Sequence, residues 1–261
     1  MDRPYLFAGD RGIAVRALEL SLDREDPPLV LCVSTRQTAT HAAELEERFR
    51  AAGGQHVIRG PQLRDPETVG WLRSQHLDFA LSVHFPDIVR PDALAVPERG
   101  WLNLHPAYLP FNRGWHTPSW AILDGTPAGA TLHVMGEAVD SGPIVARKQV
   151  TIDPSDTAHT LYQRLLEVEL NLLVEMWPTI RSSEPWPTTP NDPEEGTRHH
   201  SSELLTESVR RIDLGSTARP VELLDRLRAL TTDRWSEAAY FERDGRRFAV
   251  RVDIQEAAEA P

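Results

Sequence analysis

The chain has little cysteine, little lysine and no excess of positive charge. Only one of its 261 residues, Cys32, is a cysteine, which excludes a disulfide framework or a thiolate zinc cage within one chain. Its 28 basic residues face 39 acidic ones, a formal net charge of −11, and every basic residue except Lys148 is an arginine. Because binding to nucleic-acid phosphates needs a cationic surface, we expect no nucleic-acid partner.

Long apolar runs are missing as well. No stretch approaches the roughly 18 residues that a membrane-spanning helix needs. The N-terminus carries Asp2 and lacks the apolar segment of a signal peptide. We therefore expect a cytoplasmic protein with no membrane partner. Hydrophobic residues make up 40% of the chain, which suffices for one substantial core and a smaller appendage.

Short apolar runs alternate with amphipathic stretches through the first part of the chain. Strands are expected at 5–8, 29–33, 56–58, 77–83 and 101–105, and helices from Ile13 to before Pro27, at 39–52 and at 66–75. This alternation predicts an α/β fold with a Rossmann-like doubly wound sheet. Ligands of such a sheet bind beyond the carboxyl ends of its strands. A helix at 118–123, strands at 129–135 and 143–152, and a long helix at 157–181 complete this part.

A proline-rich polar segment separates this part from the C-terminus. We predict a catalytic domain at 1–183, a linker at 184–202 and a small α+β unit at 203–261. His199 and His200 lie in the linker, where a solvated pair is usually inert. The small unit is expected to hold a strand at 209–214, a helix at 220–230 and a β-hairpin at 238–254. A turn at Asp244-Gly245 sets Phe241 opposite Phe248 and Glu242 opposite Arg247.

Polar side chains recur at the end of one predicted strand. In the sequence WLNLHP at 101–106, alternation places Asn103 and His105 on one face and two leucines on the other. Pro106 ends the strand, so both polar groups lie where a doubly wound sheet presents its ligand site. Spacing alone leaves two interpretations open: a functional site, or structural polar groups that are satisfied internally.

A second strand repeats the arrangement. Thr131 and His133 share one face of the strand at 129–135, and Asp140 follows in the loop VDSGP at 139–143. An amide, two imidazoles and a carboxylate converging on one crevice suit acid–base chemistry. A metal site of His105, His133 and Asp140 is the less favoured alternative, because no HExxH helix or close carboxylate cluster supports it.

These stretches together resemble the folate-dependent formyltransferases, and most closely the nucleotide-sugar N-formyltransferases among them. The resemblance covers roughly residues 1–180 and is carried by NLHP at 103–106, LP at 109–110, RG at 113–114, WAI at 120–122, GATLH at 129–133 and VDSGPI at 139–144. In that family, the residues matching Asn103, His105 and Asp140 form the catalytic trio. The positions matching Thr131 and His133 lie beside them.

The resemblance implies transfer of a formyl group from N10-formyltetrahydrofolate to a primary amine. Such an amine, with a pKa near 10, is mostly protonated at pH 7, and His105 suits the removal of its proton. Asn103 suits the charge that develops on the formyl oxygen. Asp140 would orient or polarise His105. His105 could act as base or as imidazolium, and the sequence does not decide between these roles.

Family analogy also assigns the binding residues. The folate co-substrate would contact His84, Phe85, Ile88 and Val89 after one strand, and Ala138 and Val139 in the Asp140 loop. Acceptor binding would involve Arg11, Arg113 and Gly114 besides Thr131 and His133. The acidic chain and its short tail disfavour tRNA. The C-terminal hairpin and the loop at 111–116 look similar to those of enzymes that formylate amino sugars on nucleoside diphosphates, and this resemblance implies such an acceptor, most of all a dTDP-linked one, and a possible homodimer. The alternatives are an amino-acid-type amine, methionyl-tRNA, or hydrolysis of formyltetrahydrofolate.

Overall fold

The computed structural model describes residues 3–257, and a mixed seven-stranded sheet in that range carries the strand order β3-β2-β1-β4-β5-β7-β8. The strands are β1 (Tyr5–Gly9), β2 (Val30–Val33), β3 (His56–Arg59), β4 (Phe79–Val83), β5 (Trp101–His105), β7 (Ala128–Val134) and β8 (Ile144–Val150). Pairing is parallel from β3 through β5, and β7 runs antiparallel to β5. The predicted Rossmann-like doubly wound sheet is confirmed.

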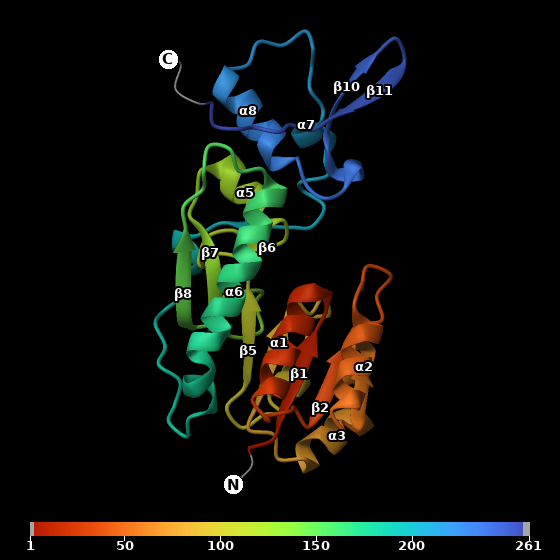
Figure 1. Ribbon diagram of the computed structural model, residues 1–261, viewed down its shortest axis with the longest axis vertical. Helices are drawn as coiled ribbons and strands as arrows, with labels where there is room; N and C mark the ends of the chain where they lie inside the picture. The colour runs from red at the N-terminus through yellow and green to blue at the C-terminus, as the bar shows by residue number, and fades with distance from the viewer. Residues whose placement is uncertain (1–2, 258–261) are drawn as a thin grey trace. The chain divides into compact units, whose positions relative to one another are not determined.

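Up to residue 181 the described chain forms six α-helices, and the sequence predicts all of them except the short one at 91–94. They are α1 (Arg11–Asp23), α2 (Ala42–Ala51), α3 (Pro66–Ser74), α4 (Pro91–Leu94), α5 (Thr117–Asp124) and α6 (Ala158–Arg181). Figure 1 shows α1 in red and α2 in orange beside β1 and β2. The Asp65 carboxylate caps α3 by accepting from the backbone N–H of Thr68 at 3.1 Å. Cys32 is fully buried in the sheet core, and burial raises the pKa of its thiol.

Three strand ends meet at the point where the strand order reverses. The chain passes from β1 outward to β2 and β3, then returns to β4 and β5 on the other side of β1. Gly9 pairs with Val83, and Val83 with Leu104, so β1, β4 and β5 end at the same edge of the sheet. That edge is where a doubly wound fold binds its ligands.

The chain forms two compact units. The first contains residues 1–105, 131–147 and 169–191, and the second contains 106–130, 148–168 and 192–261. Three elements, β7, β8 and α6, contribute residues to both units. The domain bounds at 183 and 203 stay a prediction.

The second unit is built around α5 and α8 (Pro220–Ala229), which share two apolar clusters. Its antiparallel hairpin pairs β10 (Ala239–Arg243) with β11 (Arg246–Val250), drawn in blue in Figure 1. The predicted register is confirmed, with Phe241 opposite Phe248 and Glu242 opposite Arg247. The strand predicted at 209–214 is wrong. Residues Glu207–Arg210 form the short helix α7, and Arg211 makes only an isolated bridge to Tyr240.

The proline-rich segment after α6 is largely exposed, and backbone pairing joins it to the rest of the chain. Thr189 forms an antiparallel bridge with Ile144 in the first unit. In the second unit, β9 (Arg198–His199) pairs with β6 (Arg113–Gly114), after a 3-10 turn at Pro193–Glu195. The expectation of a solvated His199 is wrong. Its ring stacks on Trp120 with 3.9 Å between centroids, and its Nε2 lies 2.9 Å from Asp124 Oδ2. The sequence pattern of α5 does not indicate that Trp120 stacks on His199.

Within residues 3–257, no helix has both the length and the apolar composition that crossing a membrane would require.

Candidate active site

Four polar side chains face one another across β5 and β7. Register pairs Asn103 with His133 and His105 with Thr131, while Leu104 pairs with Leu132 on the opposite face. Since paired residues of antiparallel strands point to the same side, Asn103, His105, Thr131 and His133 share one face of the sheet. The alternation predicted from the sequence is confirmed, and the strand register itself assembles the polar cluster.

The Asp140 carboxylate completes this cluster. Its Oδ2 lies 3.4 Å from Nε2 of His105, and its Oδ1 lies 3.5 Å from Nε2 of His133. The Asn103 amide donates to the same Oδ1 at 3.5 Å and to His133 Nε2 at 3.2 Å. His133 Nδ1 lies 3.0 Å from the Val134 carbonyl, which can only accept, so Nδ1 carries the proton and Nε2 receives the Asn103 N–H. The predicted trio of Asn103, His105 and Asp140 is brought together.

His105 is the buried, under-bonded member of the cluster. Its Nε2 has no hydrogen-bond partner among the described residues, because the 3.4 Å approach of Asp140 does not meet hydrogen-bond geometry. Burial lowers the pKa of the His105 imidazole, and the Asp140 carboxylate opposes that shift. A neutral imidazole nitrogen at the ligand-binding edge of a sheet is placed to accept a proton.

The backbone of the Asp140 loop is unusual in two places. Asp140 has φ +50°, a left-handed conformation that few side chains adopt. Gly142 passes so close to the Val134 carbonyl that a Cβ there would clash with it. The loop therefore needs both a residue that tolerates positive φ and a glycine two positions later. Both requirements concern the path that carries the carboxylate to His105.

A second buried pair lies at the end of β4. His84, with φ +51°, directs its Nε2 to both carboxylate oxygens of Glu169 at 2.9 and 3.0 Å. Glu169 is on α6 and is 0% exposed. A carboxylate is retained at such a position only when it is paired. Glu169 also acts on His105 through its charge, which favours the protonated imidazole, while His84 opposes it.

The other residues assigned to folate binding divide into buried and exposed groups. Phe85 and Val89 pack into the apolar cluster beneath the sheet, whereas Ile88 is 62% exposed. Ala138 and Val139 are exposed in the loop that leads to Asp140. Apolar groups left in water beside a polar cluster suit contact with a flat heterocycle. Phe85 and Val89 also have a packing role that does not require a ligand.

Comparison with known proteins decides the family. A family model described as Formyl transferase matches residues 21–177, more than half of the chain. The chain belongs to the formyl transferase family. A second model, described as N-formyltransferase dimerization C-terminal domain, matches residues 206–256.

Relatives of this formyltransferase include two named activities. The dTDP-4-amino-4,6-dideoxyglucose formyltransferase of Mycobacterium tuberculosis is 32% identical over 181 residues, covering 69% of this chain and 75% of the relative. Methionyl-tRNA formyltransferase of Thermodesulfovibrio yellowstonii is 26% identical over 266 aligned positions, covering 100% of this chain and 83% of the relative. Among solved structures, a Mycobacterium tuberculosis protein of uncharacterised activity, assigned as a sugar N-formyltransferase, is 26% identical. It superposes with a TM-score of 0.77 over 98% of this chain and 99% of that one.

The formyltransferase residues assigned to acceptor binding fall in both units. Arg11 opens α1 at the end of β1, with φ +67°. Arg113 and Gly114 form β6 in the second unit, where the Arg113 guanidinium donates to the Pro193 carbonyl at 3.2 Å. Gly114, at φ +99°, lies so close to the His199 carbonyl that a Cβ would clash. The glycine therefore has a structural reason for being there, the pairing of β6 with β9.

Two residues beside this cluster were not singled out by sequence reasoning. Glu169 falls on the same helical stripe as Leu165 and Leu173, so its burial was detectable as an acid within an apolar stripe. Asn191 donates to the backbone carbonyls of Asp140 and Gly142 from the proline-rich segment. No periodicity marks Asn191, because it acts from irregular chain far along the sequence.

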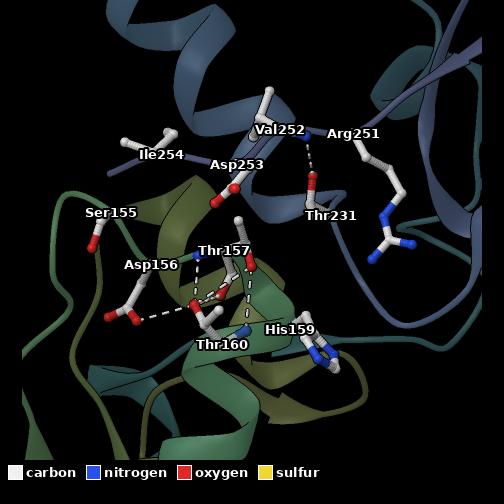
Figure 2. A pocket seen from close by; sticks show the side chains of 10 residues that line it. All are labelled: Ser155, Asp156, Thr157, His159, Thr160, Thr231, Arg251, Val252, Asp253 and Ile254. Carbon is white, nitrogen blue, oxygen red and sulfur yellow. Dashed lines mark hydrogen bonds between the residues drawn. The ribbon is translucent and has the colours of Figure 1, made fainter. Parts of the chain in front are cut away.

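A cavity of about 310 Å³ lies wholly among residues of the second unit. Figure 2 shows its lining: Ser155, Asp156, Thr157, His159, Thr160, Thr231, Arg251, Val252, Asp253 and Ile254. The hydroxyl of Thr160 accepts from the Thr157 N–H at 2.9 Å, and that of Thr231 accepts from the Val252 N–H at 3.1 Å. The first of these bonds lies at the start of α6, and the second joins Thr231 to the C-terminal chain. In the part of the chain that the structure describes, no three His, Cys, Asp or Glu side chains are grouped as a metal site.

Proposed function

We propose that this formyltransferase transfers a formyl group from N10-formyltetrahydrofolate to the primary amine of a nucleotide-linked amino sugar, with dTDP as the nucleotide. The similarity to the dTDP-4-amino-4,6-dideoxyglucose formyltransferase, 32% identical over 181 residues, is the observation that carries the acceptor. The acidic net charge of −11 supports a small acceptor over tRNA. Methionyl-tRNA is the second candidate, because a methionyl-tRNA formyltransferase aligns with the full length of the chain.

The proposed chemistry follows from the protonation state of His105. A buried imidazole whose pKa lies below its ordinary value is neutral at pH 7, so it can accept a proton from the attacking amine. The amine nitrogen then bonds to the formyl carbon, the bond from that carbon to the folate N10 breaks, and N10 takes up a proton. The products are a formamide and tetrahydrofolate.

Asn103 and Asp140 support this proton transfer in the proposal. The Asn103 amide makes one firm bond to His133 and one long bond of 3.5 Å to Asp140. The long bond is the one that can be exchanged for the negative charge developing on the formyl oxygen. Asp140 stabilises the imidazolium that forms on His105. Together with the family match, these contacts support Asn103, His105 and Asp140 as the catalytic residues.

The binding assignments extend the same proposal. We assign the folate co-substrate to His84, Phe85, Ile88, Val89, Ala138 and Val139. Acceptor binding is assigned to Arg11, Arg113, Gly114, Thr131 and His133, since a diphosphate needs cationic or backbone N–H partners. The proposed domain organisation is a catalytic domain at 1–183, a linker at 184–202 and a C-terminal unit at 203–261. The proposed location is the cytoplasm.

A homodimer is part of the proposal. The match of residues 206–256 to a dimerization domain supports it. In this region Val221, Leu223 and Leu224 on α8 are exposed, as are Trp235 and Phe248. Exposed apolar groups gathered in one small unit favour a protein partner over solvent.

Mass spectrometry of reactions with N10-formyltetrahydrofolate tests the acceptor. We expect a formylated product from a dTDP-linked amino sugar and at least about 100-fold weaker binding of the free amino sugar in calorimetry, because the diphosphate and base supply most of the contacts. Equal turnover of the free sugar, or formylation of methionyl-tRNA alone, would overturn the acceptor assignment. Formate release without any amine would indicate a hydrolase instead.

A further inference from the structure

The segment after α6 reaches the loop that carries Asp140. Thr189 and Ile144 exchange both backbone hydrogen bonds, at 2.9 and 2.8 Å, where β8 begins. Two residues later Asn191 is buried, at 8% exposure. All of these residues belong to the first compact unit. The bridge restrains the backbone two residues before Asn191, and so limits where its side chain can lie.

The Asn191 amide binds two backbone carbonyls of one loop. Its Nδ2 donates to the carbonyl of Asp140 at 3.0 Å and to the carbonyl of Gly142 at 3.0 Å. Both N–H groups are therefore used on one short stretch of loop. The other atom of the amide, Oδ1, is buried without a hydrogen-bond partner among the described residues. The buried, unpaired oxygen costs free energy, so a side chain that served only to fill space here would be better apolar.

The stretch that Asn191 holds is the one that needs restraint. Asp140 adopts φ +50°, and Gly142 is pressed against the Val134 carbonyl. From this path the Asp140 carboxylate lies 3.4 Å from His105 and 3.5 Å from His133. A residue held in a sparsely populated conformation persists only when its surroundings restrain it. Small rotations there would move the carboxylate away from both imidazoles.

We propose that Asn191 is a positioning residue of this active site, which fixes the Asp140 carboxylate against His105 by holding the carbonyls of Asp140 and Gly142. Asn191 acts through Asp140 and touches no reacting atom. This inference rests on the proposed function for its kinetic consequence, but its geometric content concerns only the distance between Asp140 and His105.

The test compares Asn191→Leu with Asn191→Gln. Leucine matches the shape of asparagine and adds no charge but donates nothing, whereas glutamine keeps the amide. Asn171→Leu is the matched control, because Asn171 is exposed on α6. We expect Asn191→Leu to lower kcat by about 10- to 100-fold, as a misplaced catalytic group does. Asn191→Gln should recover a large part of the loss, and Asn171→Leu should behave as wild type.

The titration of His105, followed by NMR of its imidazole, gives a readout that needs no turnover. Four groups act on this imidazole: Asp140 and Glu169 favour the protonated form, while His133 and His84 oppose it. All four are retained in the variants. If the carboxylate moves away, the pKa of His105 falls further below its ordinary value in Asn191→Leu. The acidic limb of the rate profile should then move to lower pH.

Two results would overturn the inference. One is a kcat of Asn191→Leu within about twofold of wild type. The other is an equal loss of kcat in the Leu and Gln variants while His105 titrates as in wild type. If Asn191→Leu does not fold, Asn191→Ala takes its place, since water can reach the freed carbonyls there. A wild-type protein that formylates nothing would refute the proposed function, and the His105 titration would still decide the role of Asn191.

Discussion

The two ends of the chain use burial in opposite ways. In the first unit, three polar side chains that water would solvate more favourably are buried: His105, His133 and Glu169. In the C-terminal unit, apolar side chains that burial would stabilise are exposed, including Val221 at 48% and Trp235 at 60%. Each region departs from the ordinary distribution in the direction that costs free energy. Such departures persist where function requires them.

The difference teaches where to look for chemistry and where for association. Buried titratable groups beside one another have altered proton affinities, which catalysis uses. Exposed apolar groups have no chemistry but gain free energy when a partner covers them. The comparison therefore predicts that mutations in the first unit change rates in a folded protein, and that mutations in the C-terminal hairpin change assembly.

The largest effect is expected from the groups nearest the reaction. His105→Ala should lower kcat by about 100- to 10,000-fold, as loss of a general base does. Asn103→Ala should lower it by about 100- to 1,000-fold, as loss of an oxyanion donor does. Stopped or quenched assays of formyl transfer, with circular dichroism to confirm folding, measure both. Near-normal turnover in a folded Asn103→Ala protein would break the assignment of chemistry to this unit.

A smaller effect, with a definite sign in pH, is expected from Asp140→Asn. The carboxylate raises the pKa of His105 against the lowering by burial, so its neutralisation should lower that pKa further. The acidic limb of the kcat profile, below which His105 is protonated and cannot act as base, should move to lower pH while the maximum rate falls about tenfold or more. A pH–rate series on both proteins checks this, and an unmoved limb at full activity would contradict the trio.

The smallest effect is expected in the hairpin. Phe241 and Phe248 stack with 5.3 Å between ring centroids, and Phe248 is partly exposed. Phe248→Ala should weaken the hairpin and the dimer by about 1 kcal/mol, the typical contribution of an aromatic pair. Sedimentation equilibrium measures the association. Turnover of the assembled protein should be unchanged, and a kcat loss like that of Asn103→Ala would erase the contrast between the regions.

Much of the fold was predictable because it is periodic. Alternation located β5 and β7, and the Asp244-Gly245 turn gave the hairpin register. The prediction of a strand at 209–214 failed because six residues of mixed polarity carry too little pattern to separate a helical turn from a strand. Where pattern extends over many residues, sequence and structure agree.

The sequence predicted the site residues on the strands but not the residues from other segments that contact them. Face alternation singles out Asn103 and His105, the family resemblance adds Asp140, and the structure places Asp140 close to both of the others. The burial of Glu169 was detectable from its apolar helical stripe, but its partner was not, because His84 is 85 residues away in the chain. Asn191 and His199 lie in irregular chain, where long-range hydrogen bonds leave no local signature.

The bridge between Thr189 and Ile144 also matters for solubility. β8 is an outer strand of the seven-stranded sheet, and outer strands present unpaired N–H and C=O groups that recruit strands from other molecules. The Thr189 bridge occupies the groups of Ile144 at the start of that strand. A chain ended before Thr189 would open this end of the edge as a template for intermolecular β-pairing.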